Sequence, residues 1–307
     1  MTEKEDNHSD PSISWRHLSV EISTQWTFRK SPSKKTILQS ISGHFTAGSL
    51  NGILGPSGAG KTTLLNVLSG SNLDYSGTFQ YFSNTSSSKS PSSSCLPVSY
   101  YIRQHVHNCV VLELSVDQLL NYAFCFKNNV TRNGKTAQAH IERTLSDLSL
   151  PLDLLHRPLS KCSGGELKRV VVAQELMSLT PPSYIILDEP TTGLDSSSAF
   201  EVMSCLKRLT RTTSAAADND NDKPMKKGMT IIATIHSPND ETLQLFDRLY
   251  VIAKGGVPIY EGRPDALRKT LQSVASLSVP SDQPPIEALL KVACSGKKIK
   301  VYFVNLI

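Results

Sequence analysis

Hydrophobic and polar residues alternate twice near the start of the chain, which is the pattern of strands that bury one face. The apolar positions are Leu18, Val20 and Ile22 and, more loosely, Leu38, Ile41 and Phe45. We therefore expect an antiparallel sheet over about residues 13–48. An apolar run at 50–54 predicts a buried strand, and the next positions have the spacing of a packed helix. The apolar positions of that helix are Leu64, Leu65, Val67 and Leu68.

The middle of the chain has helical spacing, and strands return in the last third. Residues 105–162 carry apolar positions at helical intervals, and a second helical segment begins at Ser163 and stops before the prolines at 181–182. The β-branched run 229–235 is typical of a central strand that is buried on both faces. This order predicts an α/β fold with a helical subdomain.

Glycines and low-complexity stretches interrupt these periodic segments. The runs 248–254 and 257–260 flank Gly255-Gly256, which predicts a hairpin. Residues 83–95 are rich in serine, and residues 212–228 are rich in small and charged residues. Neither stretch has the apolar residues to build a core, so we interpret both as insertions.

The composition excludes several classes of protein. The chain has 307 residues, 39% of them hydrophobic, and a net charge of +5. Because the basic residues form no clustered stripe, a solvated surface is favoured over binding to an anionic membrane face or to nucleic acid. Its six cysteines form no Cys-x-x-Cys pair, as expected of a reduced, cytosolic chain. No run reaches the roughly 18–20 apolar residues that cross a bilayer, and the polar, acidic first residues predict no signal peptide.

A phosphate-binding loop joins the strand at 50–54 to the helix that follows it. The loop residues are Gly55, Pro56, Ser57, Gly58, Ala59, Gly60, Lys61 and Thr62. Glycines allow backbone N–H groups to face phosphate oxygens, and the helix N-terminus adds partial positive charge. We expect Lys61 to bridge the β- and γ-phosphates of a nucleotide and the Thr62 hydroxyl to bind Mg²⁺.

Two carboxylates end the apolar strand 184–187. We expect Asp188 to bind Mg²⁺ through its water shell and Glu189 to orient or deprotonate the attacking water. His236 follows the buried strand 229–235, where it could contact a γ-phosphate. Gln104 precedes the helical region, where its amide could reach Mg²⁺ and water.

The tetrapeptide Ser163-Gly164-Gly165-Glu166 has two interpretations. Ser-x-x-Glu before an apolar periodic run is a capping box that begins a helix. A capping box does not explain the two glycines, each of which costs a helix about 1 kcal/mol. The glycines are expected if a phosphate approaches the backbone closely, so we favour a second phosphate-binding element.

These residues, in this order, resemble the nucleotide-binding domain of ATP-binding cassette (ABC) proteins over roughly residues 13–270. The resemblance identifies the Walker A loop as Gly55 to Thr63, the Q-loop glutamine as Gln104, the signature as Cys162 to Glu166, the end of Walker B as Asp188-Glu189, the D-loop as Gly193-Leu194-Asp195 and the switch histidine as His236. Within that superfamily the chain looks most like the G subfamily of White-type half-transporters. The matching segments are 188–196, 234–238, 245–249 and 254–262.

The resemblance implies an α/β P-loop NTPase fold of ABC type, with a mixed sheet, an antiparallel β-subdomain and a helical subdomain. We expect a disordered N-terminus at 1–12, an ATPase domain at 13–275 and a tail at 276–307 that leads toward a membrane domain. Within the ATPase domain we expect a helical subdomain at about 105–180 and insertions at 83–95 and 212–228. The aromatic residue that stacks on adenine in the family aligns with Val20, and Trp26 and Phe28 are the candidates to replace it.

The resemblance also implies a function. ATP and Mg²⁺ on the Walker A loop of one copy would be covered by Ser163 to Glu166 of a second copy, with Asp195 beside them. Hydrolysis would power transport through a membrane domain on the cytosolic face of a membrane. The partner is an identical or a different half-transporter, and no nucleic acid is expected. The alternative is a stand-alone ABC ATPase: a separate importer-type subunit, or a soluble protein associated with ribosomes or nucleic acid.

Overall fold

The computed structural model describes residues 11–23, 34–81, 99–104, 110–130, 134–180, 182, 184–211, 228–236, 238–273 and 284–294. The predicted disordered N-terminus lies outside these ranges except for Pro11 and Ser12, which begin a strand. The insertion at 83–95 lies wholly outside them, and so does the insertion at 212–228 except for Gly228. The predicted domain boundaries therefore stay predictions.

The expected antiparallel sheet is present and contains three strands. It is formed by β1 (Pro11–Ser23), β2 (Lys34–Thr46) and β4 (Ser76–Tyr81), in the order β2-β1-β4. The Trp15 ring meets Phe45 and Tyr250 edge-on, with ring centroids 5.1 and 5.2 Å apart. These aromatic contacts join the antiparallel sheet to the central sheet, because Tyr250 belongs to the latter.

The central sheet is mixed and has the strand order β5-β6-β7-β3-β8-β9. Its strands are β3 (Leu50–Leu54), β5 (Ser99–Ile102), β6 (Tyr184–Leu187), β7 (Thr230–Ile235), β8 (Arg248–Ala253) and β9 (Val257–Gly262). Only the predicted hairpin β8–β9 pairs antiparallel. Every residue of β3, β6 and β7 is buried, as their continuous apolar runs predicted.

The parallel pairing brings three carboxyl ends of strands to one edge of this sheet. Leu54 at the end of β3 pairs with Ile235 at the end of β7, and Leu187 at the end of β6 pairs with Ala233 of β7. The segments that follow these three strands therefore begin side by side, which is where ligands bind in open α/β sheets.

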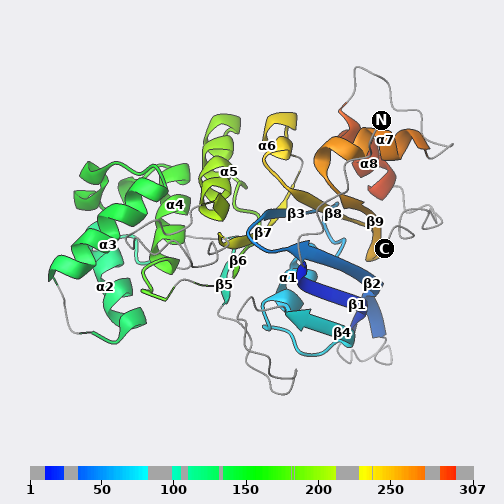
Figure 1. Ribbon diagram of the computed structural model, residues 1–307, viewed down its shortest axis with the longest axis horizontal. Helices are drawn as coiled ribbons and strands as arrows, with labels where there is room; N and C mark the ends of the chain where they lie inside the picture. The colour runs from blue at the N-terminus through cyan, green and yellow to red at the C-terminus, as the bar shows by residue number, and fades with distance from the viewer. Residues whose placement is uncertain are drawn as a thin grey trace, which may run out of the picture.

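The helices form separate groups around the sheets (Figure 1). They are α1 (Lys61–Leu68), α2 (Val116–Asn128), α3 (Gly134–Asp147), α4 (Gly164–Glu175), α5 (Ser196–Arg211), α6 (Asp240–Gln244), α7 (Leu267–Ser273) and α8 (Pro285–Cys294), with short 3₁₀ turns at Leu152–His156, Leu159–Lys161 and Pro264–Ala266. Figure 1 shows α2, α3 and α4 together at one end of the molecule. No helix in the described ranges combines the length and the apolar character that a bilayer crossing requires.

The last described helix packs on the central sheet instead of leaving the fold. Ile286, Leu289 and Ala293 of α8 are buried, and the Lys254 N–H after β8 donates to the Ala293 carbonyl oxygen at 3.0 Å. The neighbouring hairpin turn meets the antiparallel sheet, because the Gly256 carbonyl oxygen accepts the N–H of Gln39 at 3.0 Å.

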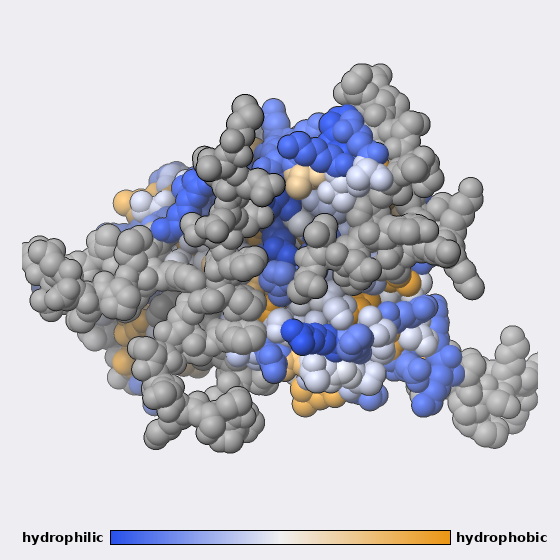
Figure 2. All heavy atoms as spheres, turned by 45° about the vertical axis from the view of Figure 1, so that its right-hand side comes forward, coloured by the Kyte–Doolittle hydropathy of each residue, from blue (hydrophilic) through white to orange (hydrophobic). Residues whose placement is uncertain are grey.

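The visible surface is mostly polar. On the face seen in Figure 2, hydrophilic residues predominate among the coloured atoms, and hydrophobic residues form small separate spots. The large hydrophobic side chains that are exposed in the described parts of the chain are Ile22, Leu73, Val111, Tyr122, Phe126, Leu152 and Leu179. Scattered exposed residues of this kind are normal for a folded domain.

Candidate active site

The predicted phosphate loop connects β3 to α1 and has the geometry of an anion cradle. Gly58 and Gly60 have φ of 75° and 103°, and a Cβ atom at Gly55 would lie 2.2 Å from the Ile252 carbonyl oxygen. Helix α1 begins after Gly60 with no side chain accepting a hydrogen bond from its first turn. The N–H groups of that turn can therefore bind phosphate oxygens, and the site fits a nucleotide.

Lys61 extends across this loop from the first position of α1. Its side chain is buried, and Nζ donates to the carbonyl oxygens of Gly55 at 2.9 Å and Pro56 at 3.3 Å. Burial lowers the pKa of Lys61, while the nearby carboxylates of Glu189 and Asp188 oppose that shift. A phosphate at the cradle would supply the ammonium with the negative charge that backbone carbonyls do not.

Asp188 and Thr62, the two residues whose oxygen atoms we expected to serve Mg²⁺, are in contact. The Thr62 hydroxyl donates to Asp188 Oδ2 at 2.9 Å, and the buried Thr234 hydroxyl donates to Asp188 Oδ1 at 2.6 Å. No cluster of three or more His, Cys, Asp or Glu suited to a metal occurs among the described residues. A hydroxyl beside one carboxylate is a donor set that fits Mg²⁺, which takes one or two carboxylates and completes its shell with water and substrate phosphates.

The sequence did not identify Thr234 or Tyr101 as part of this site. Burial, and then the Asp188 carboxylate, raise the pKa of the Tyr101 hydroxyl to about 12, and this hydroxyl donates to Asp188 Oδ2 at 3.5 Å. Thr234 precedes His236 by two residues, in a segment from which only the histidine was assigned to the site. The sequence signal for Thr234 is a hydroxyl within a buried, mostly apolar strand, since a buried hydroxyl needs a partner.

Glu189 has a left-handed backbone, with φ of 49°. Its N–H donates to the Thr234 hydroxyl oxygen at 2.8 Å, and its carboxylate Oε2 accepts from Gln104 Nε2 and from the Thr192 hydroxyl, both at 2.8 Å. Two of the predicted site residues, Gln104 and Glu189, are therefore in direct contact. A non-glycine residue in this region costs of order 1–3 kcal/mol, which the surrounding bonds must offset.

His236 lies immediately after β7, and its side chain is exposed. The strand pairing places the end of β7 beside the ends of β3 and β6. The histidine is thus at the same edge of the sheet as the phosphate loop and Asp188.

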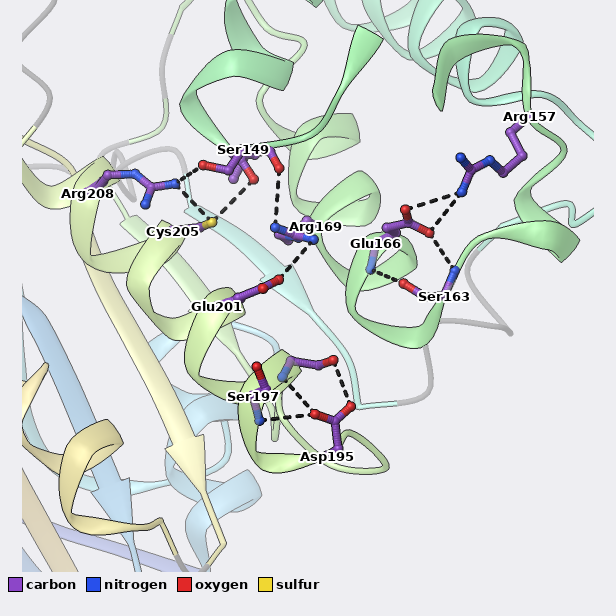
Figure 3. Close-up of polar contacts among 12 residues, drawn as sticks. Ser149, Arg157, Ser163, Glu166, Arg169, Asp195, Ser197, Glu201, Cys205 and Arg208 are labelled. Carbon is purple, nitrogen blue, oxygen red and sulfur yellow. Dashed lines mark hydrogen bonds and ion pairs between the residues drawn. The ribbon is translucent and has the colours of Figure 1, made fainter. Parts of the chain in front are cut away.

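The signature residues begin helix α4 with a complete capping box (Figure 3). The Ser163 hydroxyl oxygen accepts the N–H of Glu166 at 3.2 Å, and Glu166 Oε2 accepts the N–H of Ser163 at 2.7 Å. Burial works against ionisation of Glu166, but these bonds and the Arg157 guanidinium outweigh it and lower the pKa of Glu166. Ser163 and Gly164 are exposed, whereas most of α4 beyond them is buried.

One of the two signature glycines, Gly164, has a packing role that the sequence did not reveal. A Cβ atom at Gly164 would lie 2.9 Å from Cδ2 of Leu194, in the D-loop. A Cβ atom at Gly165 would be in ordinary contact with Ser198, at 3.4 Å. Close packing of the signature against the D-loop is thus a second reason for Gly164, besides the approach of a phosphate.

Asp195 of the D-loop caps the start of α5 (Figure 3). Its Oδ1 accepts the N–H groups of Ser197 and Ser198, both at 3.0 Å, and its Oδ2 accepts the Ser198 hydroxyl at 2.8 Å. The hydrogen bonds from Ser198 are the main reason that the pKa of Asp195 is lowered. This side chain therefore fixes the loop next to the signature.

The candidate residues form two separate groups. Lys61, Thr62, Gln104, Asp188 and Glu189 surround the phosphate loop, and the signature and Asp195 form the other group. No hydrogen bond or ion pair joins the signature residues to the phosphate loop within the described part of the chain.

The position that aligns with the adenine-stacking residue of the family is not available for stacking. Val20 is buried in the core between the sheets. The two candidates to replace it, Trp26 and Phe28, lie outside the described residues.

A phosphate loop, an Asp-Glu pair on a neighbouring strand and a capped signature helix in a separate helical group together define an ABC-type ATPase cassette. The family model described as ABC transporter matches residues 38–192. The chain therefore belongs to the ABC transporter family, and it is an ATP-binding and ATP-hydrolysing cassette.

Sequence relatives confirm the predicted G-type character. The chain is 34% identical to ABC transporter G family member 1 of Dictyostelium discoideum over 76% of this chain and 28% of that protein. It is 31% identical to ABC transporter G family member 14 of Arabidopsis thaliana over 80% of this chain and 35% of that protein. The chain thus matches about a third of the length of these relatives or less.

Solved structures confirm the fold. CbiO1 of Clostridium perfringens, part of the ABC transporter complex cbiONQ, superposes with a TM-score of 0.64 over 92% of this chain and 99% of that chain, at 22% identity. A dimeric post-hydrolysis state of the cassette MJ0796, bound to ADP and Pi, superposes with a TM-score of 0.59 over 82% of this chain and 98% of that chain, at 19% identity. The predicted P-loop fold with antiparallel and helical subdomains is confirmed.

Proposed function

We propose that this chain is the ATPase domain of a G-type half-transporter, and that ATP-driven closure of two such domains powers the movement of a substrate across a membrane. One observation carries the proposal. Ser163 and Gly164 at the start of α4 are exposed, and among the described residues the signature has no hydrogen bond or ion pair to the phosphate loop of its own chain. We infer that a second copy brings its exposed signature residues onto the bound nucleotide.

Each group then has a distinct role. The backbone of Gly55 to Thr63 and the Lys61 ammonium bind the phosphates of one copy. Ser163 to Glu166 of the second copy cover them, and Asp195 keeps its D-loop beside that signature. The Glu189 carboxylate orients the attacking water and accepts its proton, and His236 contacts the γ-phosphate.

The metal that such a site uses is Mg²⁺, and Thr62, Asp188 and Gln104 are the residues that would bind it. When bound, the ion neutralises charge on the phosphates. Thr62 already shares a hydrogen bond with Asp188, so the hydroxyl and the carboxylate are within reach of one ion.

The partner is a second half-transporter, identical or different, together with a membrane domain of its own chain or of the partner. The relatives support this, since one of them, YOL075C of Saccharomyces cerevisiae, is described as an ABC transporter ATP-binding protein/permease. We place the cassette on the cytosolic face of the membrane, with residues 13–275 as the ATPase domain and about 105–180 as its helical subdomain.

The variant Glu189→Gln tests the proposal. The change removes the proton acceptor but keeps the shape of the side chain and its capacity to accept a hydrogen bond from Thr192. We expect ATP binding to persist, turnover to fall by a factor of about 100 or more, and a dimer to accumulate with ATP. Light scattering after gel filtration measures the mass, and phosphate release measures the turnover.

The matched control is Glu113→Gln, which makes the same change at an exposed residue outside both groups. This control should match the unmodified chain in mass and turnover. Turnover by Glu189→Gln at the unmodified rate would remove Glu189 from the proposed role. A Glu189→Gln chain that stays monomeric with saturating ATP would contradict closure of two copies.

A further inference from the structure

Helix α4 carries two successive cations just after the signature. Lys168 and Arg169 have exposed fractions of 8% and 9%, although Gly164 at the start of the same helix is exposed. Burial of a charge is costly unless it is paired or hydrogen-bonded. The hydrogen-bond and ion-pair partners of these two side chains therefore show which segments hold α4 in place.

Lys168 reaches the residue that we propose as the base. Its Nζ donates to the Glu189 carbonyl oxygen at 3.4 Å, and the N–H of Thr192 donates to the same oxygen at 3.2 Å. Burial lowers the pKa of Lys168, and the Glu189 carboxylate opposes that shift. Lys168 also lines a small cavity together with Asp188 and Pro190, the two residues that flank Glu189 in the sequence.

The Lys168 bond completes a set that surrounds Glu189. The N–H is bound by Thr234, the carboxylate by Gln104 and Thr192, and the carbonyl by Thr192 and Lys168. Every polar group of this left-handed residue therefore has a partner. Of these partners, Lys168 alone belongs to α4 and so alone connects Glu189 to the signature helix.

Arg169 fixes the helix on another side (Figure 3). Its guanidinium donates to the Ser149 carbonyl oxygen at 3.3 Å and pairs with Glu201 of α5 at 3.5 Å. Since α5 begins at the D-loop, α4 is tied to both the D-loop helix and the corner after α3. Movement of the signature relative to the sheet must therefore change the position of Lys168.

We propose that Lys168 is a positioning residue for Glu189, and that α4 couples the two nucleotide sites of a dimer through it. The inference rests on the proposed function. The signature end of α4 acts on the nucleotide of the partner copy. Lys168, about one turn further along the helix, sets the backbone of Glu189, which acts on the nucleotide of its own copy.

The first test compares three variants of the full chain. Lys168→Met keeps the length of the side chain but removes its charge and its donors. We expect kcat for ATP to fall by about 10-fold and KM to change by less than about twofold, because the base and not the binding cradle is displaced. Lys168→Arg keeps a cation that can donate, and it should recover most of the lost kcat.

The matched control is Lys127→Met. Lys127 pairs at 2.7 Å with Glu175 at the opposite end of the same helix, far along α4 from Lys168. If the role of Lys168 is only structural, both Met variants should lower the melting temperature, and neither should lower kcat at temperatures where the protein is folded. That result would overturn the proposal, as would a Lys168→Arg variant no better than Lys168→Met.

The second test uses mixed dimers of two differently tagged chains. It determines whether Lys168 affects the nucleotide site of its own chain or that of the partner chain. The reference dimer has one chain with Glu189→Gln. If Lys168→Met is added to that same chain, the ATPase activity should equal that of the reference dimer, because the nucleotide site of this chain has already lost its base. Adding Lys168→Met to the other chain should lower activity by about 10-fold, since it displaces the remaining base.

The opposite order would show that Lys168 acts on the partner's nucleotide through the signature, and it would overturn the inference. Equal losses in both arrangements would also overturn it. Failure of the proposed function would be recognised separately, because Glu189→Gln alone would then leave turnover or the monomeric state unchanged.

Discussion

Lys61 brings a positive charge into a nearly closed position at the start of α1, where its neighbours are carbonyl oxygens. Carbonyl dipoles satisfy the hydrogen-bonding needs of the ammonium but do not neutralise it. Burial accordingly lowers the pKa of Lys61. A nucleotide gains binding free energy at this residue because its phosphates replace the dipoles with full charges.

We predict that Lys61→Ala weakens ATP binding by at least about 10-fold, since it removes a charge-assisted bond to phosphate while the backbone cradle remains. Titration with ATP, followed by calorimetry, measures the affinity. The control Lys135→Ala removes an exposed lysine from α3 and should leave the affinity unchanged. Equal affinities for Lys61→Ala and the unmodified chain would refute the role of Lys61.

Hydrogen bonds within a local motif could be predicted from the sequence, whereas contacts between distant segments could not. The capping box of Ser163 and Glu166 depends on residues three positions apart, so its two hydrogen bonds follow from the sequence. Thr234, by contrast, meets Asp188 and Glu189 only because β6 and β7 pair in one register. The bond between Lys168 and Glu189 likewise required the packing of α4 behind the strand.

At the level of elements, Glu261 of β9 connects the two sheets. Its Oε1 accepts the N–H of His44 in β2 at 3.1 Å, lies 3.0 Å from His44 Nδ1, and pairs with Arg248 of β8 at 3.0 Å. Burial raises the pKa of Glu261, but the bonds from His44 and the charge of Arg248 outweigh it, so the pKa is lowered. The ionised carboxylate therefore stabilises the fold.

We predict that this stabilisation disappears in acid. Because the folded-state pKa of Glu261 lies below the unfolded value, its contribution is complete at neutral pH and is lost as the pH falls through the folded pKa. At pH 7, Glu261→Gln should lower the free energy of unfolding by about 2 kcal/mol, because Arg248 loses its partner. Urea unfolding of the variant and the unmodified chain measures this difference.

The same difference should shrink toward zero once the pH is below the folded pKa of Glu261. Glu287→Gln, at an acidic residue of α8 outside this cluster, is the control for a change of charge. A difference between Glu261→Gln and the unmodified chain that stays constant down to acidic pH would contradict the link to ionisation.

Strands with a continuous apolar run could be predicted from the sequence. Strands with a weak hydrophobic pattern could not. The runs of β3, β6 and β7 are apolar throughout because both faces are covered, and the sequence shows this directly. β4 has no fully buried position, and β5 has only Ile102. Their strand conformation depends on pairing with β1 and β6, which are distant in sequence.

At the level of the whole molecule, the relatives are about three times as long as the part that this chain matches. We predict that the protein is recovered from cells in the membrane fraction, in a form well above 33.6 kDa. An antibody against residues 212–228, used on cytosolic and membrane fractions, measures this. Competition with the peptide is the control, and a specific band at 33.6 kDa in the cytosol alone would contradict the prediction.

Helix α8 also determines how a force on the end of the chain would be carried. Its buried Ile286 and Leu289 seat it on the central sheet, and its Ala293 carbonyl is bonded to Lys254 at the start of the hairpin turn. A force applied to the chain after residue 294 would therefore act directly on a packed helix. Through the hydrogen bonds of Lys254 and Gly256, such a force would reach the hairpin turn and then β2 in a close-packed interior. Helix α8 and the antiparallel sheet are thus mechanically connected through this turn.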